Sequence, residues 1–583
     1  MNRAPENNGK NATPCVPSQG TVSIEAQLDE AVDHHRAGRL FKAEEIYRRI
    51  LVAEPDYPYA LCLLGTIAQA AGENDQAVEL ISRAIAVKPG YAEANCNLGV
   101  ALMGLLRHEE AMACFENAIA LTPDYAEAHN NKGVVLMKLD RPDEAMESYR
   151  RAIDIRSDYA EAYYNLGNAM KETGQPEDAI ASYRRAIEIK PGYTDAHNNL
   201  GRVHQEQGRL DEATESCRRA LAFNRDHTEA LCTLGSLLEK QGRLDEGEDV
   251  CRRAIELKPD YAEAHANLAL ILLGKGLLKE AWDEYEWRWR IPENEQTARN
   301  YPQPRWDGTP IDGKRLLVWS EQGVGDEVRF ASMIPDLVEA NAHVVLETDP
   351  RLVSLFRRSF PDVSFIAKEN PPSSEACSQT FDFQIPCGSL GQWFRNDINF
   401  FPDRRSYLVA DAPRRNTIRE RYQDGAGDLL VGIAWNSKNK ELGGWKSLSL
   451  NEFHPLAEVP GIKLVDLQYG DTAEERAAFE EEGGHALIHD DEINQMADLD
   501  AFTAQVAALD LVVTISNTTA HIAGALGIPT WVLLNTAPLA CWMTDRNDNP
   551  WYSSVKLIRQ SRPGDWKGVI GRVVHELGKL LND

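Results

Sequence analysis

Two consecutive stretches, YAEAHNNKGVVLMKLDRPDEAMESYRRAIDIRSD at residues 125–158 and YAEAYYNLGNAMKETGQPEDAIASYRRAIEIKPG at residues 159–192, align without a gap. Their 34-residue step extends through the first half of the chain. Small residues let paired helices approach closely, and a proline, which lacks an N–H, separates most units from the next. Ser157 and Arg225 replace that closing proline in two units. The small position of the unit is occupied by Ala31, Gly65, Gly99, Gly133, Gly167, Gly201, Gly235 and Ala269.

A 34-residue period of helix–turn–helix units is the pattern of tetratricopeptide repeats, and it predicts an all-α superhelix over residues 23–291. No single unit can bury its apolar face alone, so about eight units must stack and form a long concave groove. Such a groove is typical of proteins that hold another polymer or protein, and assembly of copies through the repeats stays open. The lead, residues 1–22, is polar and is expected to be disordered.

The composition argues against several classes of protein. The chain has 583 residues, of which 43% are hydrophobic, and can therefore bury large cores. Its formal charge of −28 argues against nucleic acid as the main ligand, because phosphate backbones need clustered Lys and Arg. No apolar run predicts a transmembrane segment or a signal peptide. The ten cysteines are scattered without a C-x-x-C pair, which disfavours zinc sites and disulfides and predicts a cytoplasmic protein.

After the repeats, the pattern changes to alternating strands and helices. Residues 292–312 are rich in proline and glycine, which predicts a linker. A strand, a glycine loop, a helix and a second strand then follow in the order of a βαβ unit, which predicts a parallel sheet in residues 313–412. These elements are expected at residues 316–319, 320–326, 327–340 and 343–346.

A second series of strands predicts another lobe over residues 413–583. Two Rossmann-like α/β lobes would leave a cleft between the ends of their strands. Ligands of doubly wound folds bind at the carboxyl ends of parallel strands, so we expect the chemistry in this cleft. The strands of the second lobe are expected at residues 429–435, 463–467, 510–515 and 529–534.

The segment from Asp510 to Thr530 holds the most specific signal of this lobe. Its strand leads into a polar turn, and a helix of small residues follows at once. The N–H groups and the dipole at the start of such a helix favour an anion, and a diphosphate is the natural candidate. The alternative is an ordinary capped helix behind a strand. The candidate ligand-binding residues are Ser516, Asn517, Thr518, Thr519 and His521.

This segment resembles the signature of the ADP-heptose:lipopolysaccharide heptosyltransferases and of the wider heptosyltransferase-like group of GT-B fold. The loop Gly323-Val-Gly325-Asp326 resembles the glycine loop in the N-terminal lobe of that family, whose Asp is the proposed catalytic base. The resemblance implies that Asp326 takes the proton of the acceptor hydroxyl; a helix N-cap is its plain alternative role. Where the family usually has Asp in the C-terminal turn, this chain has the uncharged Ser516 and Asn517.

The departing diphosphate needs positive charge or N–H groups. The loop after the first strand of the second lobe carries candidates, although surface lysines are usually solvated charges. Trp435 is expected either to stack on a base or sugar or to pack in the core. No cluster of carboxylates or histidines indicates a metal, and no cofactor is expected besides the nucleotide-sugar co-substrate. The candidates on this rim are Trp435, Ser437, Lys438, Lys440, Lys446 and Gln468.

A row of asparagines recurs two residues before the small position, on the first helix of each unit, and Thr233 interrupts it. The arrangement of repeats and GT-B lobes is similar to that of the O-GlcNAc transferases, whose asparagine ladder binds an extended polypeptide. The alternative is that Asn is merely common at this position. The resemblance implies an acceptor groove with Asn97, Asn131, Asn165, Asn199 and Asn267.

Three functions fit these signals. The first is a metal-independent, inverting glycosyltransferase of hexosyl or heptosyl type that transfers a sugar from a nucleotide-diphosphate donor to a protein recruited by the repeats. The second is a non-catalytic adaptor with degenerate GT-B lobes, which the uncharged Ser516 and Asn517 favour. The third is a transferase that modifies a cell-envelope glycan.

Overall fold

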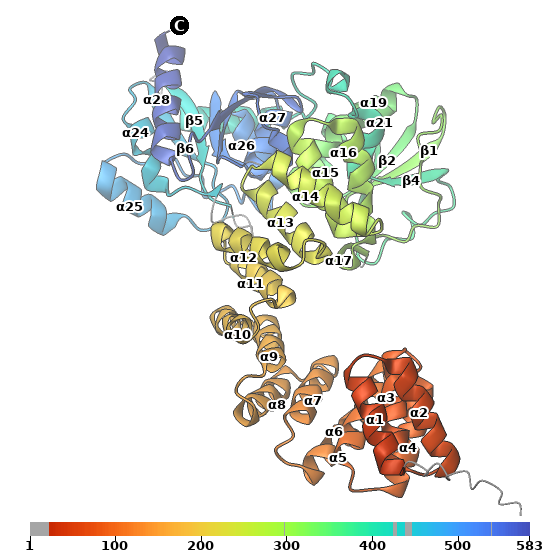
Figure 1. Ribbon diagram of the computed structural model, residues 1–583. Coiled ribbons are helices and arrows are strands. Elements are labelled where there is room, and N and C mark those ends of the chain that lie inside the picture. The colour runs from red at the N-terminus through yellow and green to blue at the C-terminus, as the bar shows by residue number, and fades with distance from the viewer. Residues whose placement is uncertain (1–22, 296–297, 424–427, 438–445, 538, 583) are drawn as a thin grey trace, which may run out of the picture. The chain divides into compact units, whose positions relative to one another are not determined.

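The computed structural model describes residues 23–295, 298–423, 428–437, 446–537 and 539–582 (Figure 1). The chain forms two compact units, residues 1–196 and 197–583, which are treated separately below. Within the described residues, the first unit is entirely helical, and the second contains further repeat helices followed by two β-sheets.

The first unit consists of helices that pair and stack as the 34-residue period predicts (Figure 1). Glycines with positive φ, such as Gly72 and Gly174, form the turns inside some of these pairs. The helices are α1 (Ile24–Arg36), α2 (Leu40–Ala53), α3 (Pro58–Ala70), α4 (Asn74–Val87), α5 (Ala92–Gly104), α6 (His108–Leu121), α7 (Ala126–Lys138), α8 (Pro142–Ile155), α9 (Ala160–Glu172) and α10 (Pro176–Ile189).

The small position is the point where the two helices of a unit come closest. A Cβ atom built on Gly133 would lie 2.5 Å from the ring of Tyr149, and one on Gly167 would lie 2.7 Å from the ring of Tyr183. Both tyrosines are buried on the second helix of their units. Glycine is therefore required here because an aromatic ring of the partner helix occupies the space of a side chain.

The second unit begins with the remaining repeat helices. They include most of α11 (Thr194–Glu206) and continue with α12 (Leu210–Phe223), α13 (Thr228–Lys240), α14 (Leu244–Leu257), α15 (Ala262–Lys275) and α16 (Leu278–Tyr285). The last helix runs directly into the 3₁₀ helix η1 (Glu286–Arg290), and the short helix α17 (Pro292–Glu295) follows.

The first lobe contains a four-stranded, fully parallel sheet with the order β3-β2-β1-β4. The predicted helix at residues 327–340 is wrong in its extent: it begins earlier and is broken, because Pro335 lies in the first turn of a new helix. The strands are β1 (Arg315–Trp319), β2 (His343–Thr348), β3 (Ser364–Ala367) and β4 (Phe383–Pro386). The helices are α18 (Val324–Phe330), η2 (Ala331–Met333), α19 (Ile334–Glu339), α20 (Val353–Ser359), η3 (Cys387–Leu390), α21 (Gly391–Phe394) and η4 (Ile398–Phe400).

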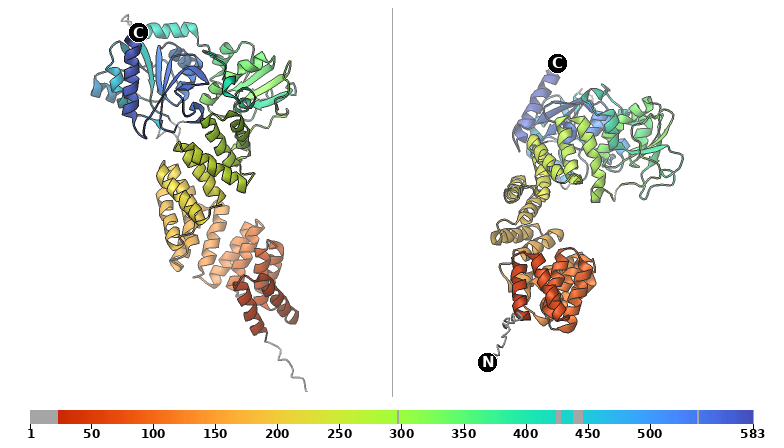
Figure 2. Two further views of the ribbon diagram at one scale, coloured as in Figure 1. Left: turned by 45° about the horizontal axis from the view of Figure 1, so that its top comes forward. Right: turned by 45° about the vertical axis from the view of Figure 1, so that its right-hand side comes forward.

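The second lobe contains a six-stranded sheet with the order β6-β5-β7-β8-β10-β9, which is parallel except for the β9–β10 pair. Helices cover both of its faces (Figure 2). The strands are β5 (Leu429–Ala434), β6 (Ile462–Asp466), β7 (Leu511–Ile515), β8 (Thr530–Leu534), β9 (Asp548–Asn549) and β10 (Tyr552–Arg559). The helices are α22 (Ala412–Tyr422), η5 (Leu450–Phe453), α24 (His454–Ala457), α25 (Ala473–Gly483), α26 (Leu499–Ala507), α27 (Thr518–Ala525), η6 (Ala540–Trp542) and α28 (Trp566–Asn582).

The last repeat helix packs into the first lobe. Trp282 is 1% exposed, and its indole N–H donates to the carbonyl oxygen of Arg395 over 2.8 Å. Trp289 lies 5.3 Å from Trp319 at the end of β1, measured between ring centroids. On the other side, the amide of Thr544 in the second lobe donates to the carbonyl oxygen of Gly274 over 2.8 Å. Repeat helices of this unit therefore contact both lobes.

Candidate active site

The two lobes meet where α18 of the first lobe lies against α27 of the second. Gly325 makes this approach possible, since a Cβ at this position would lie 3.1 Å from Cδ2 of His521 and 3.5 Å from Oγ1 of Thr518. Both helices follow strands that end at this side of their sheets, β1 and β7. The structure thus brings together the glycine loop and the polar turn, which lie almost 200 residues apart in the sequence.

Asp326 lies in the first turn of α18, whose N-cap is Gly323. Its carboxylate accepts a hydrogen bond of 2.8 Å from the guanidinium of Arg329, one turn further along the helix. The Asp326 side chain is 38% exposed, whereas Arg329 is 9% exposed and packs against the rings of Phe330 and Trp551. The buried guanidinium thus orients a carboxylate that solvent and a ligand can reach.

Lys446 is a second charged group close to Asp326. Burial lowers its pKa, while the nearby Cys541 and Asp326 act in the opposite direction. A partly buried ammonium beside the carboxylate is a suitable neighbour for an anionic ligand. Lys438 and Lys440, the other two lysines predicted here, lie outside the described residues.

The polar turn before α27 forms the N-terminus of that helix. Asn517 is the N-cap, and its Oδ1 accepts from the amide of Ala520 over 3.2 Å and from Oγ1 of Thr514 over 3.1 Å. Within the described structure, Nδ2 of Asn517 and Oγ1 of Thr519 are buried and have no hydrogen-bond partner. Buried polar groups are nearly always paired, so these two atoms are expected to meet a ligand or an ordered water.

His521 lies one turn into α27. Its Nδ1 lies 2.8 Å from the hydroxyl of Tyr552, and its ring stacks on Trp542 at a centroid distance of 5.1 Å. Burial lowers the pKa of His521 to about 3, and the positive charges of Arg329 and Lys446 act in the same direction. The imidazole is therefore neutral near pH 7 and serves as a packing and hydrogen-bonding group.

Trp435 packs in the core, which is one of its two expected roles, and Gln468, expected at the donor site, forms hydrogen bonds within the second lobe. Trp435 is 1% exposed within the core of the second lobe, and its indole N–H donates to Glu475 of α25. Oε1 of Gln468 accepts from the backbone amides of Trp435 and Asn436 over 3.0 and 2.8 Å, which ties the ends of β5 and β6 together. Both side chains therefore stabilise the second lobe.

Two further predicted residues, Ser516 and Ser437, form hydrogen bonds within the second lobe. Oγ of Ser516 accepts a hydrogen bond of 2.7 Å from the indole of Trp542. The amide of Ser437 donates to Oγ of Ser447 over 3.0 Å, and Ser437 is 8% exposed. Thr518 is half-buried and lies beside Gly325.

The asparagines of the predicted groove are all half-buried, and most of their amide groups connect neighbouring repeats. In the first unit, Nδ2 of Asn165 donates to Oδ1 of Asn130 over 3.0 Å. Nδ2 of Asn97 lies 3.5 Å from the sulfur of Cys62, and Nδ2 of Asn131 lies 3.7 Å from the sulfur of Cys96. In the second unit, Asn267 donates to Cys232. Asn199 occupies the equivalent place on α11.

Arg329 and Tyr552 were not predicted from the sequence. The spacing of three residues between Asp326 and Arg329 on a helix is a signal that could have indicated the pair. Tyr552 had no such signal, because it reaches His521 only through the pairing of β10 with β8. Within the described residues, no group of His, Cys, Asp and Glu side chains could hold a metal ion.

Comparisons with known proteins agree with the helical half of this picture. Models of the tetratricopeptide repeat match residues 62–113, 107–140, 124–192, 171–232 and 232–288. The chain therefore contains tetratricopeptide repeats, which suggest interaction with other proteins. No helix in the described part of the chain is long and apolar enough to span a membrane.

One curated relative is Protein FlbA of Caulobacter vibrioides, which is 33% identical over 314 residues. The match covers 51% of this chain and 52% of FlbA, so the chain spans about half of the length of this relative.

Among solved structures, the tetratricopeptide-repeat protein YrrB is 23% identical with a TM-score of 0.28, covering 32% of this chain and 96% of that one. A thermophilic repeat protein of Thermus thermophilus is 24% identical with a TM-score of 0.29, covering 31% and 98%. PilW, a type IV pilus biogenesis factor, is 25% identical with a TM-score of 0.34, covering 36% and 97%.

Proposed function

We propose that the chain is an inverting glycosyltransferase that moves a sugar from a nucleotide-diphosphate donor to a protein held by its repeats. One observation carries the proposal: the accessible carboxylate of Asp326 follows Gly325, which forms the seam with the start of α27, and the turn before that helix holds buried polar atoms of Asn517 and Thr519 without a partner among the described residues. Two α/β lobes with largely parallel sheets support an assignment to the GT-B fold.

In this proposal, Asp326 acts as the general base. The acceptor hydroxyl oxygen forms a bond to the anomeric carbon, the bond from that carbon to the diphosphate oxygen breaks, and the hydroxyl proton moves to the carboxylate. Arg329 keeps the carboxylate oriented through its hydrogen bond of 2.8 Å. General base catalysis of this kind contributes roughly 10²- to 10⁴-fold to a rate.

The leaving diphosphate would lie at the N-terminus of α27. Backbone N–H groups and the helix dipole favour an anion there, and the half-buried Lys446 adds a positive charge. The unpaired Nδ2 of Asn517 and Oγ1 of Thr519 are suitable donors to phosphate or sugar oxygens. Neutral donors at this turn thus take the place of the acidic residue that the resemblance led us to expect.

The adaptor function is the second candidate. The polar groups of Ser516, Trp435 and Gln468 form hydrogen bonds with other parts of the second lobe, and this favours the adaptor. A chain that has lost catalysis would keep such structural contacts and would not need Asp326. A transferase that acts on a cell-envelope glycan is the third candidate, and in it the repeats serve only for assembly.

A panel of nucleotide sugars distinguishes these candidates. The full chain is incubated with each donor, and both the melting temperature and the release of nucleoside diphosphate are measured. We expect at least one donor to raise the melting temperature and to be hydrolysed slowly in the absence of acceptor. Binding without any release by the chain, with or without a protein acceptor, would favour the adaptor.

A further inference from the structure

The asparagine row is interrupted at Thr233, and the interruption changes the contacts between repeats. In other units, the asparagine of one repeat donates to a residue 35 positions earlier, as Asn165 does to Asn130 and Asn267 to Cys232. These hydrogen bonds close the gap between the first helices of successive repeats.

At Thr233 this bond is not formed. The shorter side chain donates from Oγ1 to the carbonyl oxygen of Glu229 in its own helix, over 2.9 Å. The residue 35 positions earlier is Asn198, which is 4% exposed, and its Oδ1 has no hydrogen-bond partner in the described structure. A buried amide oxygen without a donor is costly, so Asn198 is expected to accept a hydrogen bond from a ligand or a water.

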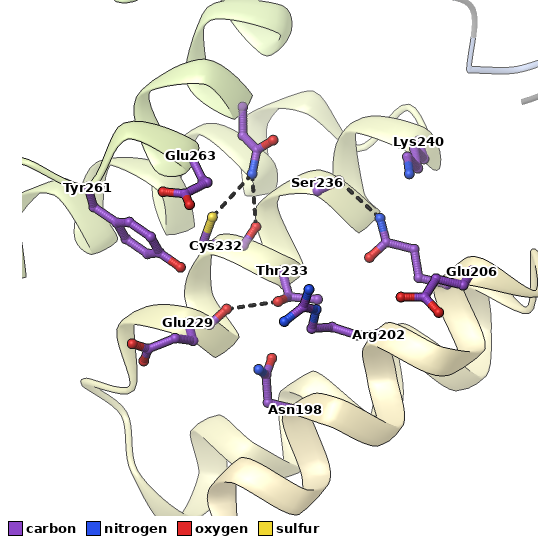
Figure 3. A pocket seen from close by; sticks show the side chains of 12 residues that line it. Asn198, Arg202, Glu206, Glu229, Cys232, Thr233, Ser236, Lys240, Tyr261 and Glu263 are labelled. Carbon is purple, nitrogen blue, oxygen red and sulfur yellow. Dashed lines mark hydrogen bonds between the residues drawn. The ribbon is translucent and has the colours of Figure 1, made fainter. Parts of the chain in front are cut away.

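The missing contact lies in a cavity of about 550 Å³ on the groove side of α11, α13 and α15 (Figure 3). Figure 3 shows Glu229, Tyr261 and Glu263 on one side of Thr233, with Arg202 near the middle and Lys240 on the opposite side. Glu206 lies on the side of Lys240, so one end of the cavity is acidic, the other end carries both charges, and the buried asparagine lies between them.

Several charges of this cavity form no ion pair with the part of the chain that the structure describes. In the described residues, Glu263, Arg202 and Lys240 form no ion pair, whereas Arg243 and Glu246 on the neighbouring helix α14 form one. Exposed arginines and carboxylates of these repeats are mostly paired, for example Arg253 with Asp226. Unpaired charges beside an unsatisfied buried amide are typical of a surface that binds a charged, hydrogen-bonding partner.

We propose that this cavity holds a lysine or arginine side chain of the polypeptide acceptor. The cationic head lies between the carboxylates of Glu229 and Glu263, and a main-chain N–H of the same segment donates to Oδ1 of Asn198. The proposal rests on the proposed role of the repeats in holding the acceptor, and it adds a local requirement for a basic residue.

The variant Thr233→Asn tests this inference directly, because it restores the residue found in the other units. The new amide donates to Asn198 as Asn165 does to Asn130, so the variant has a higher melting temperature and Oδ1 of Asn198 is no longer available to a ligand. Glu263→Gln keeps the shape of the cavity and removes one carboxylate. Glu246→Gln, on α14, is the matched control and removes an exposed carboxylate outside the cavity.

Binding is measured with the full chain and three fluorescein-labelled peptides of 13 residues, without any nucleotide sugar. The peptides consist of Ser, Gly and Ala and differ only in the central residue, which is Lys, norleucine or Glu. The lysine peptide binds about fivefold more tightly than the norleucine peptide, and the glutamate peptide binds more weakly still. Glu263→Gln reduces the preference for lysine, and Glu246→Gln leaves it unchanged.

Thr233→Asn weakens binding of the lysine peptide by about tenfold or more while raising the melting temperature. Equal binding of all three peptides, absence of binding by any of them, or unchanged affinity in Thr233→Asn would overturn the proposal. Since no donor is present, these outcomes do not depend on sugar transfer, and a failure of the glycosyltransferase proposal is seen separately in the donor panel.

Discussion

At the scale of single residues, the buried His521 makes the stability of the native protein depend on pH. The pKa of this imidazole is about 6.5 in an unfolded chain and about 3 in the native protein, because burial and two nearby cations disfavour the charged form. Between these values the unfolded state binds a proton that the native state does not, so this contribution to stability is complete above pH 6.5 and decreases as the pH falls toward 3.

We therefore expect the variant His521→Gln to lose less stability in acid than the natural chain. The variant loses the stacking on Trp542 at every pH, but between pH 7.5 and pH 4 the difference in stability changes by roughly 3 kcal/mol in the direction that favours the variant. The measurement is urea unfolding of both proteins across this pH range. If the free energies of unfolding of the two proteins changed in parallel with pH, His521 would be protonated in the native protein or accessible to solvent.

The local motifs of the site could be predicted from the sequence, but not every role within them. The glycine loop of Asp326 and the turn at Asn517 were recognisable because each is continuous in the chain. The role of Trp435 stayed open and Gln468 was expected at the donor site, because the contacts of these side chains depend on α25 and on the end of β5, which are distant in sequence. A residue at a strand end can face either the ligand or the core, and only tertiary packing decides between them.

At the scale of elements, the 3₁₀ helix η1 holds the loop that leads to Asp326. The guanidinium of Arg288 forms two hydrogen bonds of 2.8 and 2.9 Å to Glu321, and both side chains are almost fully buried. Glu321 in turn accepts from the amide of Gly388 over 2.8 Å, and Gln322 donates to the hydroxyl of Tyr285 over 2.6 Å. The last repeat thus fixes the position of the glycine loop.

The variant Arg288→Met is expected to leave Glu321 buried without its partner. Removing one member of a buried ion pair costs about 3–5 kcal/mol, so unfolding of the second unit should shift by that amount. The double variant Arg288→Met/Glu321→Gln removes the uncompensated charge and should recover part of the loss. Chemical denaturation of the three proteins checks this, and a fully stable single variant would show that the pair does not hold the loop.

The repeat helices could be predicted more completely than the strands. The signal of each unit recurs every 34 residues, and the glycines recur where a side chain of the partner helix requires space. The strands β3, β4, β9 and β10 were not predicted, because they are short or depend on pairing with β2, β1 and β8. The break before Pro335 was missed although proline is a known helix breaker.

At the scale of the whole molecule, the repeats and the first lobe do not separate at the predicted linker. Trp282 is buried against α21, and Trp289 packs on Trp319 of β1. A chain that begins at Gly313 would expose these surfaces, so we expect it to aggregate. A chain of residues 197–583 keeps the whole compact unit and should fold and bind the donor. Gel filtration and thermal unfolding compare the two, and a monomeric, cooperatively folded chain from Gly313 would contradict this view.

The central claim is that the seam transfers a sugar with Asp326 as the base, and turnover by the intact chain tests it most directly. The natural protein, Asp326→Asn and the exposed control Asp362→Asn are compared with a donor that stabilises the fold and with a lysine-containing polypeptide acceptor. We expect Asp326→Asn to remain folded with a lower melting temperature, because Arg329 loses its anionic partner, and to keep its donor affinity but release nucleoside diphosphate at least about 100-fold more slowly, while Asp362→Asn behaves as the natural chain. Equal rates for Asp326→Asn and the natural protein would contradict the account.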